Sequence, residues 1–331
     1  MRGLVLVAVL LVACSNQPNA VSSPTVTPTS SPTPTRTATS SPTPSPAPIS
    51  LPTTAQLSAS SGGVVWAFVG GTRLFRSSDR GDTWVERSTP PTLVSTEMSF
   101  GDDRNGLLLT TGNPIPDCQT QTASIGKTAD GAATWQRVTA TGIADPMCKR
   151  GLAVADATRA FFTTYSPNAG SLVYRTADGG ATWIASSPLP IPPNLASHGA
   201  LFVSITARPR AFGSTVLVEG GAGQTKDVFR STDGGGTFTY ASTFEASAIV
   251  AYVTATRWLQ IGPPGAGTSM ETTDGGVTWH TYATDYSQAA PVAPEIVFGD
   301  AQTGYATVRG EIQRTTDGGA HWTKIKTPGT G

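Results

Sequence analysis

The chain has 331 residues, enough for one large all-β domain or two smaller domains. Its 22 basic and 22 acidic side chains balance, which argues against a nucleic-acid partner, because such proteins normally carry a basic excess that neutralises phosphates. The 36 glycines and 26 prolines favour short strands joined by turns, and no stretch has the period of a long amphipathic helix. Beyond the first dozen residues, no apolar run is long enough to span a bilayer.

The N-terminus has the pattern of an export signal. Arg2 supplies a positive start, and residues 3–12 form an apolar run of signal-peptide length. The run ends in Leu11-Val12-Ala13-Cys14, which resembles a bacterial lipobox and implies that Cys14 is acylated and holds the protein at a membrane. We assign residues 1–14 to a lipoprotein signal peptide. The alternative is an ordinary signal peptide with a cysteine there by chance.

Residues 15–54 are dominated by Ser, Thr, Pro and Ala. Such a segment has too little apolar surface to offset its ordering entropy, so we expect a disordered linker. Its prolines favour an extended stalk of ~3.1 Å per residue. The stalk would hold a domain away from the membrane. We expect the anchor at the outer face of the cell membrane, or alternatively a location in the periplasm or at an outer membrane.

Two cysteines remain after Cys14. Outside the cytoplasm, Cys118 and Cys148 can form a disulfide. The alternative is a pair of unrelated buried thiols.

An eight-residue segment recurs through the rest of the chain. Its six copies are Ser77–Trp84, Thr128–Trp135, Thr176–Trp183, Ser231–Phe238, Thr272–Trp279 and Thr315–Trp322. Each copy has an aspartate at its third position, and these are Asp79, Asp130, Asp178, Asp233, Asp274 and Asp317. The pattern Ser/Thr-x-Asp-x-Gly-x-Thr-Trp resembles the Asp box, or bacterial neuraminidase repeat.

The chemistry of this repeat is structural. Asp and Ser/Thr side chains can hydrogen-bond the amides of a tight turn, glycine supplies its positive φ, and the aromatic residue packs beneath the hairpin. Ala132 replaces the motif glycine and His321 replaces the motif threonine, so we expect looser turns in repeats two and six. Phe238 replaces tryptophan and keeps an apolar anchor.

Successive motif aspartates lie 41 to 55 residues apart, a period that fits a four-stranded propeller blade. We therefore predict an all-β fold in which residues 55–327 form one six-bladed β-propeller, with the repeat in each turn between strands C and D. Seven blades remain an alternative.

We expect the ligand site on the face that carries the B–C and D–A connections. The long connections, residues 112–124, 139–150, 187–199 and 284–294, all belong to this face. Function is commonly carried by loops on a rigid scaffold. The candidate binding residues are Asp117, Asp145, Lys149, Arg150, His198, Tyr286 and Glu295. For each of them, a solvated loop position is the simpler explanation.

The repeat is shared by sialidases, some glycan-active enzymes, sortilin-type receptors and photosystem II assembly-factor propellers. Sialidases hold a substrate carboxylate with three arginines, and the Phe/Tyr-Arg-Ile-Pro motif of the first arginine is absent here. The basic residues before the repeats, Arg76, Arg175, Arg230 and Arg314, lie at the structural end of a blade. Only Arg150 and Arg257 remain as loose candidates.

The sequence of the repeat at Arg175–Trp183 is more similar to that of the assembly-factor propellers. Those proteins have no catalytic centre. The resemblance does not imply a role in photosynthesis. The three histidines are scattered, and no metal-ligand spacing, nucleophile elbow or phosphate loop is present. We therefore expect no metal and no cofactor.

We interpret the protein as a monomeric, non-enzymatic module that binds or assembles a protein or glycan. The alternative is a divergent sialidase or other glycoside hydrolase. An enzyme of that kind predicts arginines or paired carboxylates converging at the mouth of the central channel. The binding module predicts a partner and no hydrolysis of glycosyl reporters.

Overall fold

The computed structural model describes residues 46–60, 63–90, 95–166, 170–197, 199–221, 225–245, 247–261, 269–287 and 294–331, with the side chains of Ser95 and Asp117 excepted. The predicted signal peptide with Cys14, most of the predicted linker, and the candidate His198 lie outside the described residues. Ala47–Gly331 forms one compact unit. In the part of the chain that is described, no helix is both long enough and apolar enough to cross a membrane.

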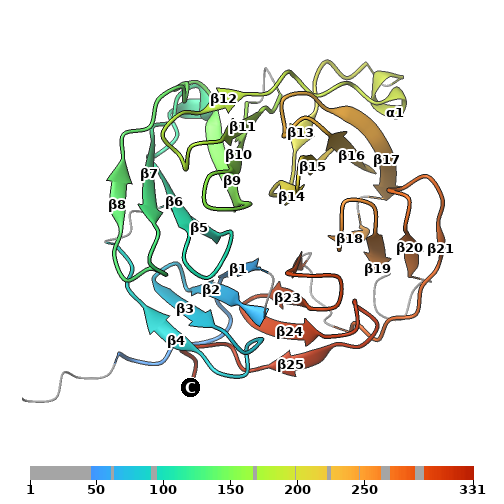
Figure 1. The fold of residues 1–331 in the computed structure, drawn as a ribbon. Coiled ribbons are helices and arrows are strands. Elements are labelled where there is room, and N and C mark those ends of the chain that lie inside the picture. Colours follow the sequence, from blue (N-terminus) through green and yellow to red (C-terminus); the bar gives the residue numbers. More distant parts are fainter. Residues whose placement is uncertain are drawn as a thin grey trace, which may run out of the picture. The chain divides into compact units, whose positions relative to one another are not determined.

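Six antiparallel sheets stand around a central channel (Figure 1). The expectation of an all-β, six-bladed propeller is confirmed. We number the blades 1–6 in chain order and call the strands of each blade A to D from the channel outward.

The strands of the first three blades follow one another without exchange between sheets. They are β1 (Ala55–Ala59), β2 (Val65–Val69), β3 (Arg73–Ser77) and β4 (Val85–Arg87) in blade 1; β5 (Ser95–Phe100), β6 (Gly106–Thr111), β7 (Ala123–Thr128) and β8 (Gln136–Val138) in blade 2; and β9 (Cys148–Val154), β10 (Ala160–Tyr165), β11 (Val173–Thr176) and β12 (Ile184–Ala185) in blade 3.

Blades 5 and 6 have the same four-stranded order, whereas strand A of blade 4 is split into two short strands. The strands are β13 (Ser204–Ile205), β14 (Arg210–Phe212), β15 (Thr215–Gly221), β16 (Thr225–Ser231) and β17 (Thr239–Glu245) in blade 4; β18 (Ile249–Tyr252), β19 (Trp258–Ile261), β20 (Met270–Thr272) and β21 (His280–Thr281) in blade 5; and β22 (Glu295–Phe298), β23 (Gly304–Val308), β24 (Glu311–Thr315) and β25 (Thr323–Ile325) in blade 6. The short helices η2 (Pro116–Cys118) and α1 (Pro193–Ala196) lie in the connections.

All six repeated turns use the same hydrogen bonds. In blade 3, the amide of Gly180 donates to Thr176 Oγ1 at 3.1 Å, and the amide of Thr182 donates to Asp178 Oδ1 at 2.9 Å. Each motif Ser or Thr hydroxyl also contacts its own motif aspartate, at 2.6 to 2.9 Å. These bonds satisfy the amides of a turn that lies outside the strand ladders.

The looser turns expected in repeats two and six are not found. Ala132 adopts a φ of 61° and donates its amide to Thr128 Oγ1 at 3.0 Å, as the glycines do elsewhere. The imidazole of His321 takes the place of the threonine hydroxyl, with Nδ1 2.6 Å from Asp317 Oδ2. The turn geometry therefore tolerates both substitutions.

The motif aromatics join neighbouring blades. Each one packs in an apolar cluster built from its own blade and the preceding blade; for example, Trp183 of blade 3 lies with Leu107 and Ile125 of blade 2. The six aromatics are Trp84, Trp135, Trp183, Phe238, Trp279 and Trp322. Trp183 and Phe238 are buried and the other four are half-buried. Burial of these rings stabilises the blade-to-blade contacts of the ring.

The ring closes between blades 1 and 6 without sharing strands. Ile49 forms a parallel bridge with Thr330, and the amide of Thr53 donates to the Arg309 carbonyl at 3.0 Å. Across the same junction, Arg314 Nη1 donates to the Arg80 carbonyl at 2.8 Å. Ile49 and Thr53, which the sequence assigned to the linker, thus pair with the chain's last residues and with blade 6, respectively.

Candidate functional site

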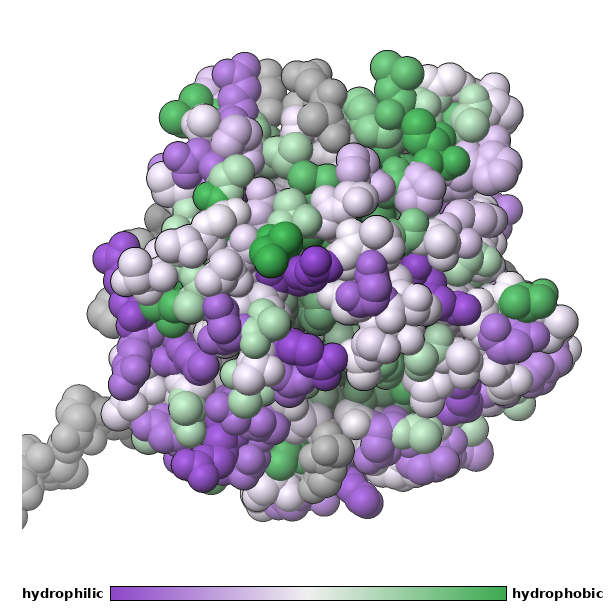
Figure 2. Space-filling view, turned by 45° about the horizontal axis from the view of Figure 1, so that its top comes forward, coloured by the Kyte–Doolittle hydropathy of each residue, from purple (hydrophilic) through white to green (hydrophobic). Residues whose placement is uncertain are grey.

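A pocket of about 470 Å³ lies in the central channel. Glu97, Arg150 and Glu295, which line it, lie near the start of their A strands, where the D–A connections enter. The pocket therefore opens on the long-loop face. A second cavity of about 440 Å³ lies toward the A–B turns, and the two cavities share Arg208 and Arg210. Figure 2 shows hydrophilic residues bordering a central hollow of the ring.

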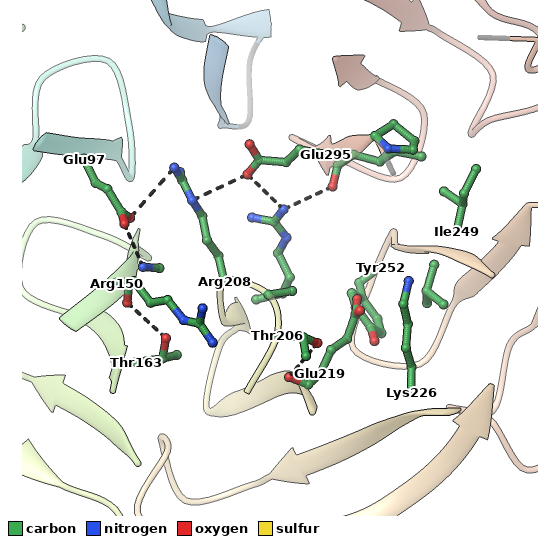
Figure 3. Close-up of a pocket in the computed structure, with 16 residues that line it drawn as sticks. Glu97, Arg150, Thr163, Thr206, Arg208, Glu219, Lys226, Ile249, Tyr252 and Glu295 are labelled. Carbon is green, nitrogen blue, oxygen red and sulfur yellow. Dashed lines mark hydrogen bonds and ion pairs between the residues drawn. The ribbon is translucent and has the colours of Figure 1, made fainter. Parts of the chain in front are cut away.

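The split A strand of blade 4 delivers two arginines into the channel. β13 and β14 both pair with β15, but five steps from Ile205 to Arg210 oppose only three steps from Gly220 to Leu217. The two extra residues form a bulge, and Pro209 within it cannot donate to a ladder. The side chains of Arg208 and Arg210 line the pocket beside this bulge (Figure 3).

These two arginines meet carboxylates from other blades. Arg208 lies between Glu97 of blade 2 and Glu295 of blade 6, at N–O distances of 3.9 and 3.7 Å. Arg210 Nη2 lies 3.5 Å from Glu295 Oε1 and donates to the Ile296 carbonyl at 3.2 Å. Distances of 3.5 Å and more are ion pairs without a short hydrogen bond, so both guanidinium groups keep donors for a further partner.

Two further cations line the pocket without a carboxylate partner among the described residues. Arg150 donates Nη2 to the Ile205 carbonyl at 2.6 Å, and its guanidinium lies 5.2 Å from the centre of the Tyr165 ring. Lys226 Nζ donates to the Ala248 carbonyl at 2.7 Å. Bonds to neutral carbonyls leave Arg150 without an ion-pair partner among the described residues, whereas Lys226 acts on Glu219 through its charge but forms no salt bridge with it.

Glu219 is the buried acid of the pocket. It is 9% exposed, and its carboxyl lies beside Tyr252 (Figure 3). Burial raises the pKa of Glu219, and the positive charges of Lys226 and Arg210 offset this only in part. The pocket is lined by four cationic side chains and by three carboxyl groups, those of Glu97, Glu295 and Glu219. The excess of cations favours an anionic ligand.

The wall formed by blades 5 and 6 is partly apolar, with Ile249, Val250, Pro294 and Ile296 lining it. The aromatic residue among the lining residues is Tyr252, which is only 6% exposed. The pocket thus combines a cationic wall with an aliphatic wall, and its described lining residues offer no open aromatic face on which a sugar ring could stack.

Two of the residues proposed from the sequence, Arg150 and Glu295, meet in this pocket. Asp145, Lys149 and Tyr286 do not line it. Lys149 is buried and donates Nζ to the carbonyls of Gln121 and Asp145, at 2.5 and 2.6 Å. Burial lowers the pKa of this amine. The Lys149 side chain thus joins the connection that contains Gln121 to the one that contains Asp145.

Two further sequence candidates lie in other parts of the structure. Asp117 is in η2, and Tyr286 is buried with its ring 5.3 Å from that of Trp322. The predicted disulfide between Cys118 and Cys148 is confirmed, and it joins η2 to the first residue of β9. Among the described residues, no group of three His, Cys, Asp or Glu side chains could hold a metal ion.

The arginines near the repeats have structural partners. Arg230 Nη2 donates to the Gly275 carbonyl of the next blade's turn at 2.6 Å. Arg257 pairs with Glu271 and donates Nη2 to the Gly318 carbonyl at 3.1 Å. These contacts hold blades together, and Arg257 does not line the pocket.

Sequence reasoning missed Arg208, Arg210, Glu97, Glu219 and Lys226. A signal for two of them was present: Arg208-Pro209-Arg210 places a proline and two charges where an inner strand should continue. Glu219 and Lys226 lie inside strands β15 and β16, whereas the candidates were chosen from the long connections and their borders.

The fold and the pocket together define a six-bladed β-propeller with a cationic central pocket. No protein-family model and no curated protein matches the chain. Solved structures match its fold. YCF48 from Cyanidioschyzon merolae has a TM-score of 0.51 at 16% identity, over 84% of this chain and 86% of that one.

Two further solved structures are less similar in shape. YCF48 bound to a D1 peptide has a TM-score of 0.47 at 17% identity, over 83% of this chain and 82% of that one. An α-L-arabinofuranosidase from Fusarium graminearum with an iminosugar inhibitor has a TM-score of 0.46 at 12% identity. The match covers 76% of this chain and 87% of that one. At such identities the likeness concerns the fold alone.

Proposed function

We propose that the protein is a non-enzymatic binding or assembly module that holds a carboxylate-bearing segment of a partner protein in the central pocket. The observation that carries this proposal is the presence of Arg150 and Lys226 in a 470 Å³ pocket with no carboxylate partner among the described residues. A ligand carboxylate would form charge-assisted hydrogen bonds with them.

The aliphatic wall favours a peptide over a glycan. Ile249, Val250 and Ile296 could contact an apolar side chain, whereas a pyranose presents hydroxyls that these residues leave without partners. An assembly role, as the resemblance of the repeats implies, would use the same pocket to recognise a chain end or an acidic segment.

A glycoside hydrolase is the second candidate. Arginines and carboxylates do converge in the channel, which is the arrangement that such an enzyme predicts. Glu219 has the raised pKa of a general acid, and Glu97 and Glu295 supply further carboxylates. We rank this candidate second because both of those glutamates are engaged by Arg208, and Glu97 also accepts two backbone amides.

We also propose that the protein is exported and tethered through an acylated Cys14, with the segment after it acting as a stalk, and that it acts as a monomer. The Cys118–Cys148 disulfide is consistent with a location outside the cytoplasm. Metabolic labelling with an alkyne fatty acid tests the anchor: the wild type should be labelled and Cys14→Ser should not. Labelling of that variant would contradict the assignment.

A binding screen tests the function. The full-length chain is exposed to a random heptapeptide library with free C-termini, and the bound peptides are compared with their C-terminal amides. The proposal requires peptides that bind as acids and lose affinity as amides. Sialyl, arabinosyl and other aryl glycosides are assayed in parallel, and turnover that Glu219→Gln abolishes would establish the second candidate instead.

A further inference from the structure

The inner edge of each A strand carries amides that do not pair with strand B. In blades 2 and 3, side chains from the preceding blade accept hydrogen bonds from these amides. Gln56 Oε1 and Ser58 Oγ accept from the amides of Met98 and Phe100 at 3.0 and 3.2 Å. Ser99 Oγ accepts from the amide of Val154 at 2.9 Å, and Glu97 from those of Gly151 and Leu152 at 3.1 and 2.8 Å.

Blade 5 lacks such caps. The amide of Val253 donates to the Arg257 carbonyl, so the alternation of an antiparallel ladder turns the amides and carbonyls of Val250 and Tyr252 away from β19 and toward the channel. Among the described residues, no hydrogen-bond partner reaches the amides of Val250 and Tyr252. Both residues line the pocket.

The reason is the residue type in blade 4. Arg210 occupies the position held by Ser58 in blade 1 and Ser99 in blade 2. Each of the three residues pairs with a residue of strand B, and that residue pairs in turn with the last basic residue of strand C, just before the repeated turn. Serine can accept a hydrogen bond from an amide, whereas arginine is a donor only. Arg210 turns instead to the Ile296 carbonyl of blade 6. The amide of Tyr252, which is the counterpart of Phe100 in blade 2, is thereby left without a cap.

We propose that the ligand is bound as an extended strand that pairs with the inner edge of β18, while its carboxylate reaches Arg150 or Lys226. The proposal rests on the proposed function and specifies the form of its ligand. Val250 and Tyr252 each offer one donor and one acceptor, the pattern that an added β-strand uses. The aliphatic side chains beside them, Ile249 and Ile296, suit alternate side chains of such a strand.

The test uses the tightest heptapeptide from the free-acid library, synthesised with a single N-methyl group at each position in turn. Pairing with β18 predicts that affinity falls about tenfold at alternate positions and changes little at the positions between, because only every second amide faces the edge.

Protein variants give an independent measurement. Val250→Pro removes an edge amide that is not part of the ladder with β19, so the blade should fold, and peptide affinity should fall about three- to tenfold. Val250→Ala controls for the side chain. Ala59→Pro is the matched control, because it places proline on the inner edge of β1, outside this pocket, and should leave affinity within twofold.

The outcomes separate the two proposals. A peptide that needs its carboxylate but tolerates N-methylation at every position, or binds Val250→Pro as it binds Val250→Ala, overturns strand pairing and leaves the proposed function standing. Failure to recover any acid-dependent peptide overturns both.

Discussion

Arg208 Nε lies 3.7 Å from Glu295 Oε1, although Arg208 belongs to blade 4 and Glu295 to blade 6. The same guanidinium lies 3.9 Å from Glu97 of blade 2. One side chain thus meets charges from two blades that are not adjacent to its own, at the boundary between the pocket and the second cavity. In the structure, Glu295 serves both Arg208 and Arg210 and therefore competes with any ligand carboxylate for them.

Glu295→Gln should strengthen binding of a carboxylated peptide by about three- to tenfold, because the variant frees two guanidinium groups and adds one net positive charge to the pocket. Titration calorimetry with the library-derived peptide measures the change. The matched control is Glu86→Gln, which breaks the pair with Arg73 outside the pocket and should leave affinity unchanged. Weaker binding by Glu295→Gln would show that this glutamate orients the arginines for the ligand.

Thr176→Val should destabilise the propeller by about 1–3 kcal/mol, because the isosteric change leaves the buried amide of Gly180 without its acceptor. Chemical denaturation monitored by tryptophan fluorescence measures the loss. Thr323→Val, on an exposed position of β25, is the control and should change stability little. Equal stability of the two variants would mean that the repeated turns do not depend on the hydroxyl.

The repeated turns also predict how stability depends on pH. Hydrogen bonds from Thr182 and Thr176 lower the pKa of Asp178 from 3.8 to about 2, and similar bonds lower the pKa of Asp130 to about 2. A carboxyl whose pKa is lower in the folded state stabilises the fold above its unfolded pKa and loses that contribution as pH falls toward the folded value. The melting temperature should therefore fall between about pH 4 and pH 2.

Asp178→Asn isolates this effect. It should lower the melting temperature at pH 6 and narrow its difference from the wild type as the pH approaches 2. Glu245→Gln, at an exposed carboxylate of β17, is the control and should change the melting temperature little at pH 6. A pH-independent difference for Asp178→Asn would contradict the assignment.

The disulfide closes a loop with a sequence separation of 30 and ends two residues before Arg150. Replacing both cysteines by serine should cost about 3–4 kcal/mol, because the unfolded chain regains the entropy of that loop. Denaturation with and without reductant measures it, and reductant should have no effect on the double variant. Unchanged stability after reduction would contradict this contribution.

Much of the fold could be predicted from the sequence because the repeat is local. Asp178 bonds to amides within four residues, and the spacing of such turns sets the number of blades. In β24, Ile312 alternates with more exposed neighbours, and such a period-2 pattern is typical of a half-buried strand.

The site could be predicted only in part. Arg150 and Glu295 were found because they border long connections. Glu219 was missed because its role depends on burial beside Tyr252, which comes from the next blade. Arg208 was missed because its partners lie in blades 2 and 6, and no local pattern encodes contacts across a channel.

A double-mutant cycle tests the central claim most directly. The dissociation constants of the library-derived heptapeptide, as acid and as amide, are measured for the wild type and for the Arg150→Gln, Lys226→Gln double variant. A carboxylate held by these cations predicts that amidation weakens wild-type binding about 10- to 100-fold and has little effect on the double variant. An equal loss on amidation in both proteins would contradict a carboxylate site in the central pocket.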